Sequence, residues 1–165
     1  MIDDALKEAF RKIYEGEAKA FLRLRAYAKV AAMEGLPQIA HLFEAIAASE
    51  EVHGVRALQR LEILRDTETN LKKSFESEEL VAEKAYDAFI RLASEAGDEV
   101  ALKIFTQSRD VEKTHAQLYK KAMSHMLEER KTTYYICKIC GYVSDGVLPD
   151  VCPVCGAKRE HFEEV

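Results

Sequence analysis

Residues 39–64 read IAHLFEAIAASEEVHGVRALQRLEIL, and the positions of the charged side chains within this stretch decide the fold. Its apolar side chains recur at every third or fourth position, which is the spacing of the buried face of an amphipathic helix. In the middle of that face, Glu50 and His53 interrupt the apolar series. A buried carboxylate without a partner costs several kcal/mol. We therefore expect a bound cation beside Glu50.

Three other stretches repeat this pattern. Glu17 interrupts the apolar face of the first, Glu78 that of the third, and Glu112 with His115 that of the fourth. Four carboxylates that meet in an apolar interior cannot neutralise one another, so a metal ion must lie among them. On the third stretch, the expected buried face consists of Leu71, Phe75, Glu78, Ala82, Ala85, Phe89 and Leu92.

Short segments rich in glycine or capping residues separate four long helices. The second helix is expected to end near Arg65, the third to begin near Thr69, and the fourth to continue to about Arg130. Each helix then has close to thirty residues and a length of about 45 Å. Long helices joined by short connections indicate an all-α four-helix bundle. The separating segments are Gly35-Leu36-Pro37, Asp66–Asn70 and Gly97-Asp98.

Composition excludes several classes of protein. A net charge of −5 and a pI near 5.6 argue against nucleic-acid binding, which requires a basic surface. The sequence contains no glycine-rich phosphate loop, and no uncharged apolar run is long enough to span a membrane. The N-terminus, Met-Ile-Asp-Asp, lacks the apolar region of a signal peptide, so we expect a protein of the reducing cytoplasm.

The character of the chain changes at Thr132, where a β-prone run begins and turn residues become frequent. We therefore expect two domains, residues 1–131 and residues 132–165. The second domain is too short to fold by apolar burial alone, so it requires a disulfide or a metal ion to hold it together.

All four cysteines lie in this tail, as Cys137-x-x-Cys140 and Cys152-x-x-Cys155. Two such motifs in a chain without an export signal predict a metal site rather than disulfides. Four thiolates form a closed tetrahedral site that fits iron or zinc. A single iron would suit one-electron transfer, and a structural zinc site is the alternative.

Residues three apart on a helix share one face, so Glu50 and His53 can bind one metal centre, as can Glu112 and His115. Together with the two single glutamates, they give the ligand set of di-iron carboxylate bundles. Oxygen and imidazole ligands suit iron or manganese. Two divalent cations would balance the four carboxylates, and such a site fits two-electron chemistry on a small oxygen species. The six candidate ligands are Glu17, Glu50, His53, Glu78, Glu112 and His115.

Over nearly its whole length the chain resembles the rubrerythrins. The tail is similar to rubredoxin in its Cys-x-x-Cys-Gly-Tyr and Cys-Pro-x-Cys-Gly motifs. The motifs that carry the resemblance in the helical part are Gly16-Glu17-Ala18, Tyr27-Ala28-Lys29-Val30-Ala31, Glu34-Gly35, Gln38-Ile39-Ala40, Asn70-Leu71-Lys72, Tyr86 and Glu112-x-x-His115.

This resemblance implies a ferritin-like four-helix bundle joined to a small metal-stapled, rubredoxin-like β/turn domain. It implies two iron ions in a di-iron centre and one iron held by the four cysteines. It also implies a cytoplasmic homodimer that reduces hydrogen peroxide to water in oxidative-stress defence. Electrons would come through a reductase protein, and the iron–sulfur domain of one subunit would serve the di-iron centre of the other. Tyr86 would join the six ligands as a catalytic residue.

The sequence departs from the family pattern at two positions. Family members usually carry a second glutamate on the third helix as a seventh ligand, and Val81 occupies that position here. In the family, this carboxylate binds one iron in the oxidised state, and the histidine matching His53 replaces it on reduction. With Val81 there, we expect His53 to remain a ligand in both states. A tyrosine that the family carries near the metal ions is matched by Leu24.

Three functions follow from these observations. The first is a peroxidase in which the tail iron re-reduces the di-iron centre. The second is a ferroxidase or iron-handling protein that consumes dioxygen, which the loss of the seventh carboxylate at Val81 favours. The third is a protein without enzymatic activity that signals oxidation to a partner.

Overall fold

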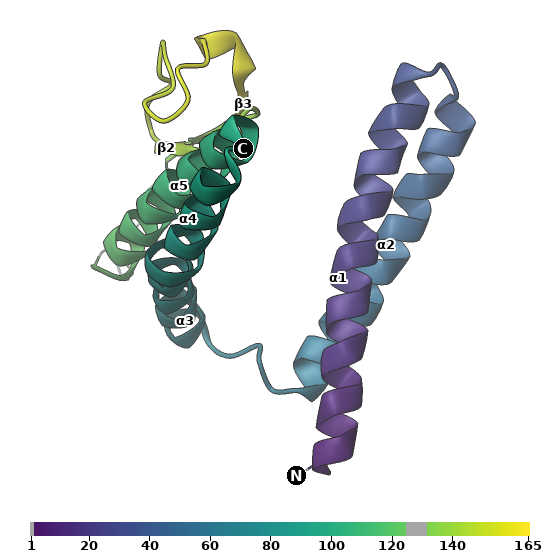
Figure 1. Cartoon of the computed structure of the whole chain (residues 1–165). Helices are drawn as coiled ribbons and strands as arrows, with labels where there is room; N and C mark the ends of the chain where they lie inside the picture. The colour runs from purple at the N-terminus through teal and green to yellow at the C-terminus, as the bar shows by residue number, and fades with distance from the viewer. Residues whose placement is uncertain (1, 125–131) are drawn as a thin grey trace. The chain divides into compact units, whose positions relative to one another are not determined.

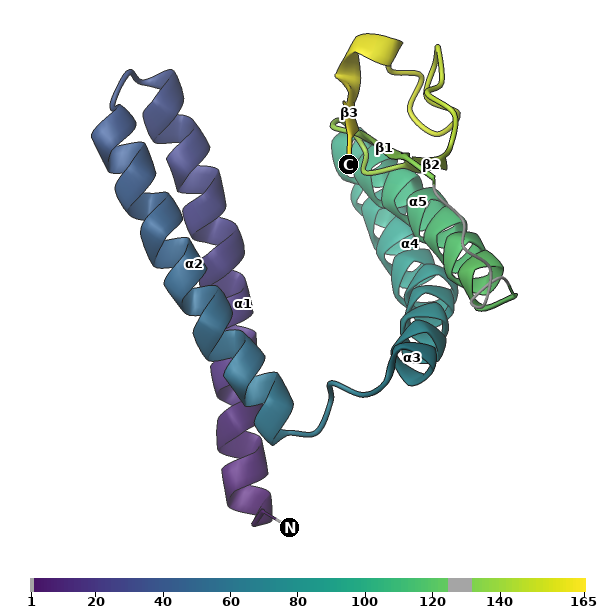
Figure 2. The same cartoon turned by 180° about the vertical axis from the view of Figure 1, so that it is seen from behind.

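A computed structural model of the chain describes residues 2–124 and 132–165. The chain forms two compact units, Met1–Arg65 and Asp66–Val165. The first unit is a pair of long helices, and the second combines a helical part with a small three-stranded sheet (Figures 1 and 2). Among the described helices, none combines the length and the apolar character needed to cross a bilayer.

The first unit consists of α1, Asp4–Met33, and α2, Pro37–Arg60. Asp3 caps α1 by accepting a hydrogen bond from the backbone N–H of Ala5 at 2.8 Å. Gly35 ends α1 in the left-handed conformation (φ 74°), and the N–H groups of Gly35 and the next residue return to carbonyls of the last turn of α1. The expected glycine and proline signals between these helices are therefore correct.

Small side chains make the contact between α1 and α2. Gly54 of α2 is buried against α1, and a Cβ atom placed on it would lie 3.6 Å from Cβ of Glu17. Larger apolar residues beside this contact stay exposed, as Ile13 (44%) and Ile46 (39%) show. The first unit therefore carries an open apolar face next to its acidic residues. The buried residues of the two helices are Ala28, Ala31, Ala40, Ala47, Gly54 and Ala57.

The end of α2 differs from the prediction. We expected the helix to end near Arg65, but it ends at Arg60. Glu62 adopts the left-handed conformation (φ 57°), and the N–H groups of Glu62 and Ile63 bond to carbonyls of the last turn of α2. This is the same closing motif that glycine forms after α1. It was not predicted because glutamate rarely adopts that conformation.

The second unit begins with α3, Thr67–Leu80, whose N-terminus is capped by Asp66. A π-helical turn, η1, Val81–Ala85, then leads into α4, Tyr86–Ala96. The sequence predicted one continuous helix in place of these three elements. A π-turn contains one residue more per turn than an α-helix, so it changes which positions face the neighbouring helix. Accordingly Ala82 is 1% exposed, whereas Phe89 and Leu92, expected on the same face, are 44% and 63% exposed.

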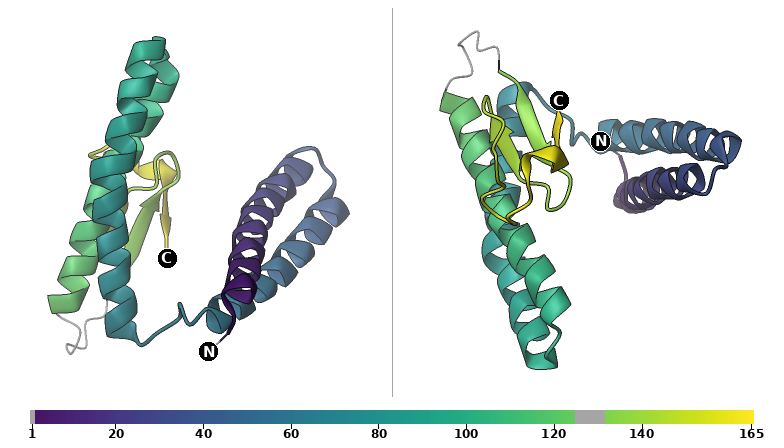
Figure 3. Two further views of the ribbon diagram at one scale, coloured as in Figure 1. Left: turned by 60° about the horizontal axis from the view of Figure 1, so that its bottom comes forward. Right: turned by 90° about the horizontal axis from the view of Figure 1, so that it is seen from above.

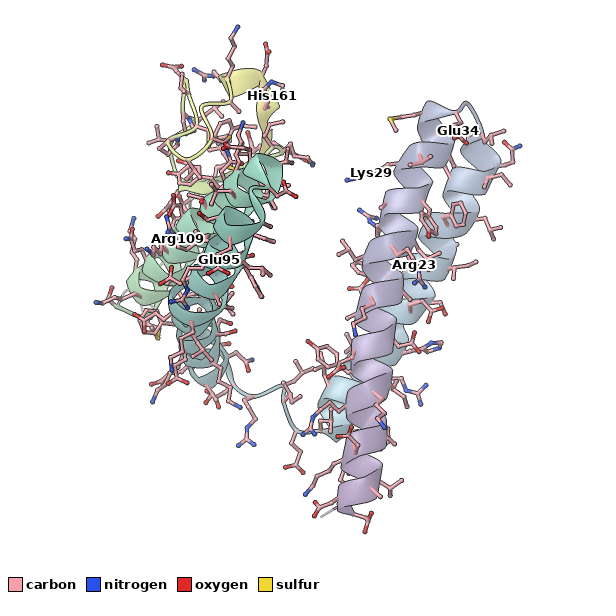
Figure 4. The ribbon with its side chains drawn as sticks, viewed as in Figure 1. Arg23, Lys29, Glu34, Glu95, Arg109 and His161 are labelled. Carbon is pink, nitrogen blue, oxygen red and sulfur yellow. The ribbon has the colours of Figure 1, made fainter. Side chains whose placement is uncertain are left out.

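The last helix, α5, Glu99–Ser124, packs against α3, η1 and α4. Gly97 ends α4 in the left-handed conformation (φ 67°), and Asp98 caps α5 by accepting from the N–H of Ala101. Arg109, marked in Figure 4, reaches Asp87 of α4 at 4.0 Å, which ties the two helices together. The predicted continuation of this helix to about Arg130 lies outside the described residues.

The tail forms an antiparallel sheet in the order β2-β1-β3. Its strands are β1, Tyr134–Cys137, β2, Val143–Asp145, and β3, Phe162–Glu164, and a short 3-10 turn, η2, Arg159–His161, precedes β3. Strand β2 contacts α5, so the sheet lies against that helix (Figure 3).

Candidate metal centres

The first unit brings three of the predicted ligands together. Glu17 projects from α1, and Glu50 and His53 lie one helical turn apart on α2. His53 Nδ1 lies 3.2 Å from Glu50 Oε2 and 3.8 Å from Glu17 Oε1. One ligand atom from each residue lies within 4.8 Å of the other two. Glu51, next to Glu50 in the sequence, is exposed instead.

The two carboxyl groups of this first group compete for one proton. The hydrogen bond that Glu17 donates to Glu50, followed by burial, raises the pKa of Glu17. The hydrogen bonds from Glu17 and then His53 lower the pKa of Glu50. In the metal-free protein, Glu17 therefore tends to hold the proton and Glu50 the negative charge. A cation bound among these atoms would remove the need for that proton.

The second unit repeats the arrangement with the other three predicted ligands. Glu78 projects from α3, and Glu112 and His115 lie one turn apart on α5. His115 Nδ1 lies 3.0 Å from Glu112 Oε2, and all three residues offer ligand atoms within 4.8 Å of one another. Burial, together with a hydrogen bond and the charge of Glu112, raises the pKa of Glu78 to about 7. The adjacent residue Glu79 is exposed.

Metal binding by the second group is expected to weaken as the pH falls below 7. Glu78 holds a proton below its pKa of about 7, and a metal ion must displace it. Because the metal ion competes with this proton, affinity for the metal should fall by roughly tenfold for each pH unit below the pKa of Glu78. Titration of the metal-free protein with Mn²⁺ between pH 6 and 8 measures the effect.

Glu78→Gln should remove this proton-linked part of the affinity change, whereas Glu79→Gln should retain it.

The metal-free protein should show the opposite trend in stability. Because folding raises the pKa of Glu78 above the ordinary value of 4.5, its contribution to stability is lost as the pH rises towards 7. An affinity for Mn²⁺ that is equal at pH 6 and pH 8 would contradict this interpretation.

The four cysteines of the tail meet at one point. The Sγ atoms of Cys137 and Cys155 are 3.7 Å apart. Those of Cys140 and Cys152 are 3.6 Å apart, and all four lie within 4.8 Å of one another. Cys137 and Cys152 are almost completely buried, and all four are free of disulfides.

Two matching turns build this four-cysteine site. Gly141 (φ 84°) and Gly156 (φ 76°) each follow the second cysteine of a motif, and each donates its N–H to the carbonyl of the first cysteine. Burial raises the pKa of Cys140. Burial also acts to raise the pKa of Cys137, but hydrogen bonds from backbone N–H groups of the loop and from the thiols of Cys155 and Cys140 together outweigh it and lower that pKa. Those N–H groups therefore favour a thiolate at Cys137, the form that binds a metal.

One contact joins the tail to the second ligand group. His115 Nε2 lies 3.3 Å from the carbonyl oxygen of Gly141, the residue after Cys140. An Nε2–H donor on His115 leaves Nδ1 unprotonated and directed at the carboxylates, which is the form that binds a metal. Gly141 also lies close to α5, since an added Cβ would meet Val111 at 3.9 Å. No short-range motif in the sequence predicted this contact between His115 and Gly141.

Two further residues singled out in the sequence lie near η1. Val81 is its first residue and is partly buried. Tyr86 is the first residue of α4, and its ring packs edge-on against Phe89, with centroids 6.0 Å apart. The role of Tyr86 beside the metal ions stays a prediction.

The donor atoms fit the expected metals. Each carboxylate group combines oxygen ligands with one imidazole nitrogen, a set that suits iron or manganese. A hydrogen bond raises the pKa of Glu17 and burial raises that of Glu78, and a cation bound beside them would instead favour the charged carboxylates. The four thiols suit iron or zinc.

Comparison with known proteins gives matches along most of the chain. The family model described as Rubrerythrin matches residues 4–123. The model described as Rubrerythrin, rubredoxin-like domain, matches residues 135–163.

Curated relatives and solved structures agree with these matches. Nigerythrin of Nitratidesulfovibrio vulgaris is 30% identical over 94% of this chain and 84% of its own length. Rubrerythrin of the same organism is 28% identical over 91% of this chain and 88% of its own length. A solved structure of nigerythrin in its fully reduced, all-ferrous state is similar with a TM-score of 0.60 and 29% identity, over 96% of this chain and 86% of that chain.

Proposed function

Because this chain belongs to the rubrerythrin family, we propose that it is a peroxidase that reduces hydrogen peroxide to water at a di-iron centre. Proteins of this family are oxidoreductases that react with peroxide or dioxygen and take electrons from reductases. An iron-dependent role in oxidative-stress defence follows from the family, and peroxide as the substrate is our proposal.

The family also confirms two predictions from the sequence. The fold class is the ferritin-like helical bundle with a rubredoxin-like domain. The cofactors are the two iron ions of a di-iron centre and one iron held by four cysteines. We propose residues 1–131 and 132–165 as the two domains.

We propose that the two carboxylate groups each supply three ligands to the di-iron centre. Loaded with two ferrous ions, such a centre supplies the two electrons that, with two protons, convert one hydrogen peroxide molecule to two water molecules. The four carboxylates balance the charge of the two ions. Glu78, with its pKa of about 7, can take up or release a proton near neutral pH when a metal does not hold it. Tyr86 is proposed as a further catalytic residue.

The observation that carries the proposal is the contact between His115 and the four-cysteine loop. Its 3.3 Å hydrogen bond to Gly141 supports a path between the proposed one-electron site of the tail and the second ligand group. Storage of iron alone has no need for such a connection. In this chain the loop lies against its own α5, so electrons can reach this ligand group within one chain. The tail is therefore proposed to deliver electrons one at a time.

A stopped-flow comparison tests the function. The fully reduced protein is mixed with hydrogen peroxide and, separately, with dioxygen, and oxidation is followed by visible absorbance. Faster oxidation by peroxide supports the peroxidase. Faster oxidation by dioxygen supports the ferroxidase or iron-handling alternative, and slow reaction with both supports a redox sensor.

The ferroxidase alternative rests on Val81, which stands where the family carries its seventh carboxylate. Val81→Glu is expected to restore a redox-linked change of ligand on the His53 side. Crystal structures of this variant in both oxidation states measure the change. Identical ligation in the two states would contradict our account of Val81.

The remaining partners are also proposals. We propose that a reductase protein donates electrons to the tail and that the protein acts as a cytoplasmic homodimer. The four free cysteines agree with a reducing compartment.

A further inference from the structure

We propose that Asp145 is a positioning residue that holds the four-cysteine loop against His115 and so determines how fast an electron leaves the tail. This inference rests on the proposed function, since it assumes that the tail delivers electrons to the carboxylate groups. It concerns how the tail is held on α5.

Asp145 makes two short contacts to residues outside the sheet. It is the last residue of β2, and its side chain is only 8% exposed. One carboxylate oxygen accepts from Lys121 Nζ of α5 at 2.7 Å, and the other accepts from the hydroxyl of Thr132 at 2.7 Å. A largely buried carboxylate with a charged partner forms a stronger contact than an exposed ion pair. Asp145 therefore fastens β2 to α5 and to the start of the tail.

The turn after Asp145 is shaped around this contact. Gly146 adopts the left-handed conformation (φ 78°), and its N–H donates to the carbonyl of Thr133 at 2.8 Å. A Cβ atom on Gly146 would lie 3.3 Å from the hydroxyl oxygen of Thr132, closer than side chains normally allow. The glycine thus leaves room for the hydroxyl that binds Asp145.

Apolar packing does not fix this interface alone. A hollow of about 400 Å³ lies between the tail and the helices, with His115 on its wall. Close packing normally determines how two surfaces fit. Atoms that line a hollow lack packing contacts on one side, so they constrain the fit less. Two polar contacts beside this hollow, His115 with Gly141 and Lys121 with Asp145, join the tail to α5. The apolar and aromatic residues around the hollow are Leu71, Leu118, Tyr119, Ala122, Tyr134 and Val143.

The chain offers a matched control. Lys138 forms an ion pair with Glu163, and both side chains are more than half exposed. This pair joins the residue after β1 to β3 within the tail, so its loss should leave the docking of the tail on α5 unchanged. Lys138→Met breaks a lysine–carboxylate pair within the tail, whereas Asp145→Ala breaks one that reaches α5.

The step that Asp145 serves is the transfer of one electron. With iron held by the four cysteines and by the carboxylate groups, the tail iron would go from ferrous to ferric as one ferric ion at the carboxylate groups went to ferrous, so that no other reactant would be consumed. Because transfer through protein slows steeply with separation, a tail that moves away from His115 should transfer more slowly. The reduction potential of the tail iron should stay the same, since its four ligands are unchanged.

Two measurements on the full chain test the proposal. Hydrogen–deuterium exchange reports docking of the tail without any turnover, and photoreduction of the tail iron followed by its re-oxidation reports internal transfer without peroxide. In Asp145→Ala, exchange in the four-cysteine loop should rise about tenfold and transfer should slow about tenfold, because a buried contact is lost. Both should be unchanged in Lys138→Met.

Unchanged exchange and transfer in Asp145→Ala would overturn the proposal. If that variant loses the colour of the ferric tail, Lys121→Met removes the same ion pair without changing the tail sequence. It should then show faster exchange and slower transfer, and native values would overturn the proposal. Failure of the proposed function is a separate result, because native protein would then transfer no electron or ignore peroxide, whereas the exchange difference would persist.

Discussion

Replacement of Glu50 by glutamine is expected to lower iron affinity and peroxide turnover by more than about 100-fold. Changes to residues that only support metal ligands already cost roughly 10–100-fold, and Glu50 is a proposed ligand. Its carboxylate lies 3.2 Å from Nδ1 of His53, and hydrogen bonds from Glu17 and then His53 lower the pKa of Glu50, so Glu50 carries the negative charge of the group. Iron content after purification and stopped-flow rates with peroxide measure the loss.

Glu51→Gln is the matched control, because Glu51 is the next residue on α2 and is exposed. It should bind iron and react with peroxide as the native protein does. The second unit offers the same comparison, with loss expected in Glu78→Gln and native behaviour in Glu79→Gln. Equal effects of the two variants in either pair would show that the grouped carboxylates are not the ligands.

Replacement of Cys152 by serine is expected to abolish the visible colour of the tail iron and to unfold residues 132–165. Cys152 is 2% exposed, and the tail is too short to fold without its metal. Turnover that depends on a reductase should stop. A chemically reduced sample should still undergo one oxidation by peroxide, because the carboxylate groups remain.

Val151→Ser is the control for this change, since Val151 precedes Cys152 and is 58% exposed. It should retain the colour, the slow hydrogen exchange of the tail and the reductase-dependent turnover. A Cys152→Ser protein with a folded tail and full turnover would contradict the assignment of an electron-carrying metal site to the tail.

Much of the architecture was predictable because the decisive signals are local. Glutamate and histidine three residues apart on a helix must share a face, and Glu50 with His53 does so in the structure. Gly35 and Gly97 end their helices as glycine normally does. The paired cysteine motifs likewise form one cluster.

The features that the sequence did not predict have specific physical causes. Glu62 ends α2 in a conformation that glutamate adopts rarely, so no propensity rule indicated it. The π-turn Val81–Ala85 falls within a stretch of good helix formers. The contact between His115 and Gly141 joins residues 26 positions apart, and the polar contacts of the folded tail place them together.

The buried glycine of α2 bears on which ions the first group can accept. Since Gly54 has no side chain, Cβ of Glu17 lies close to α2, which limits how far the carboxylate of Glu17 can stand from its neighbours on α2. Alanine fits there at an ordinary contact distance, but a branched side chain would force the helices apart. A wider site would favour cations of larger ionic radius, so we expect a branched residue at position 54 to shift the preference of the first group from transition metals towards calcium, although glycine offers no ligand atom.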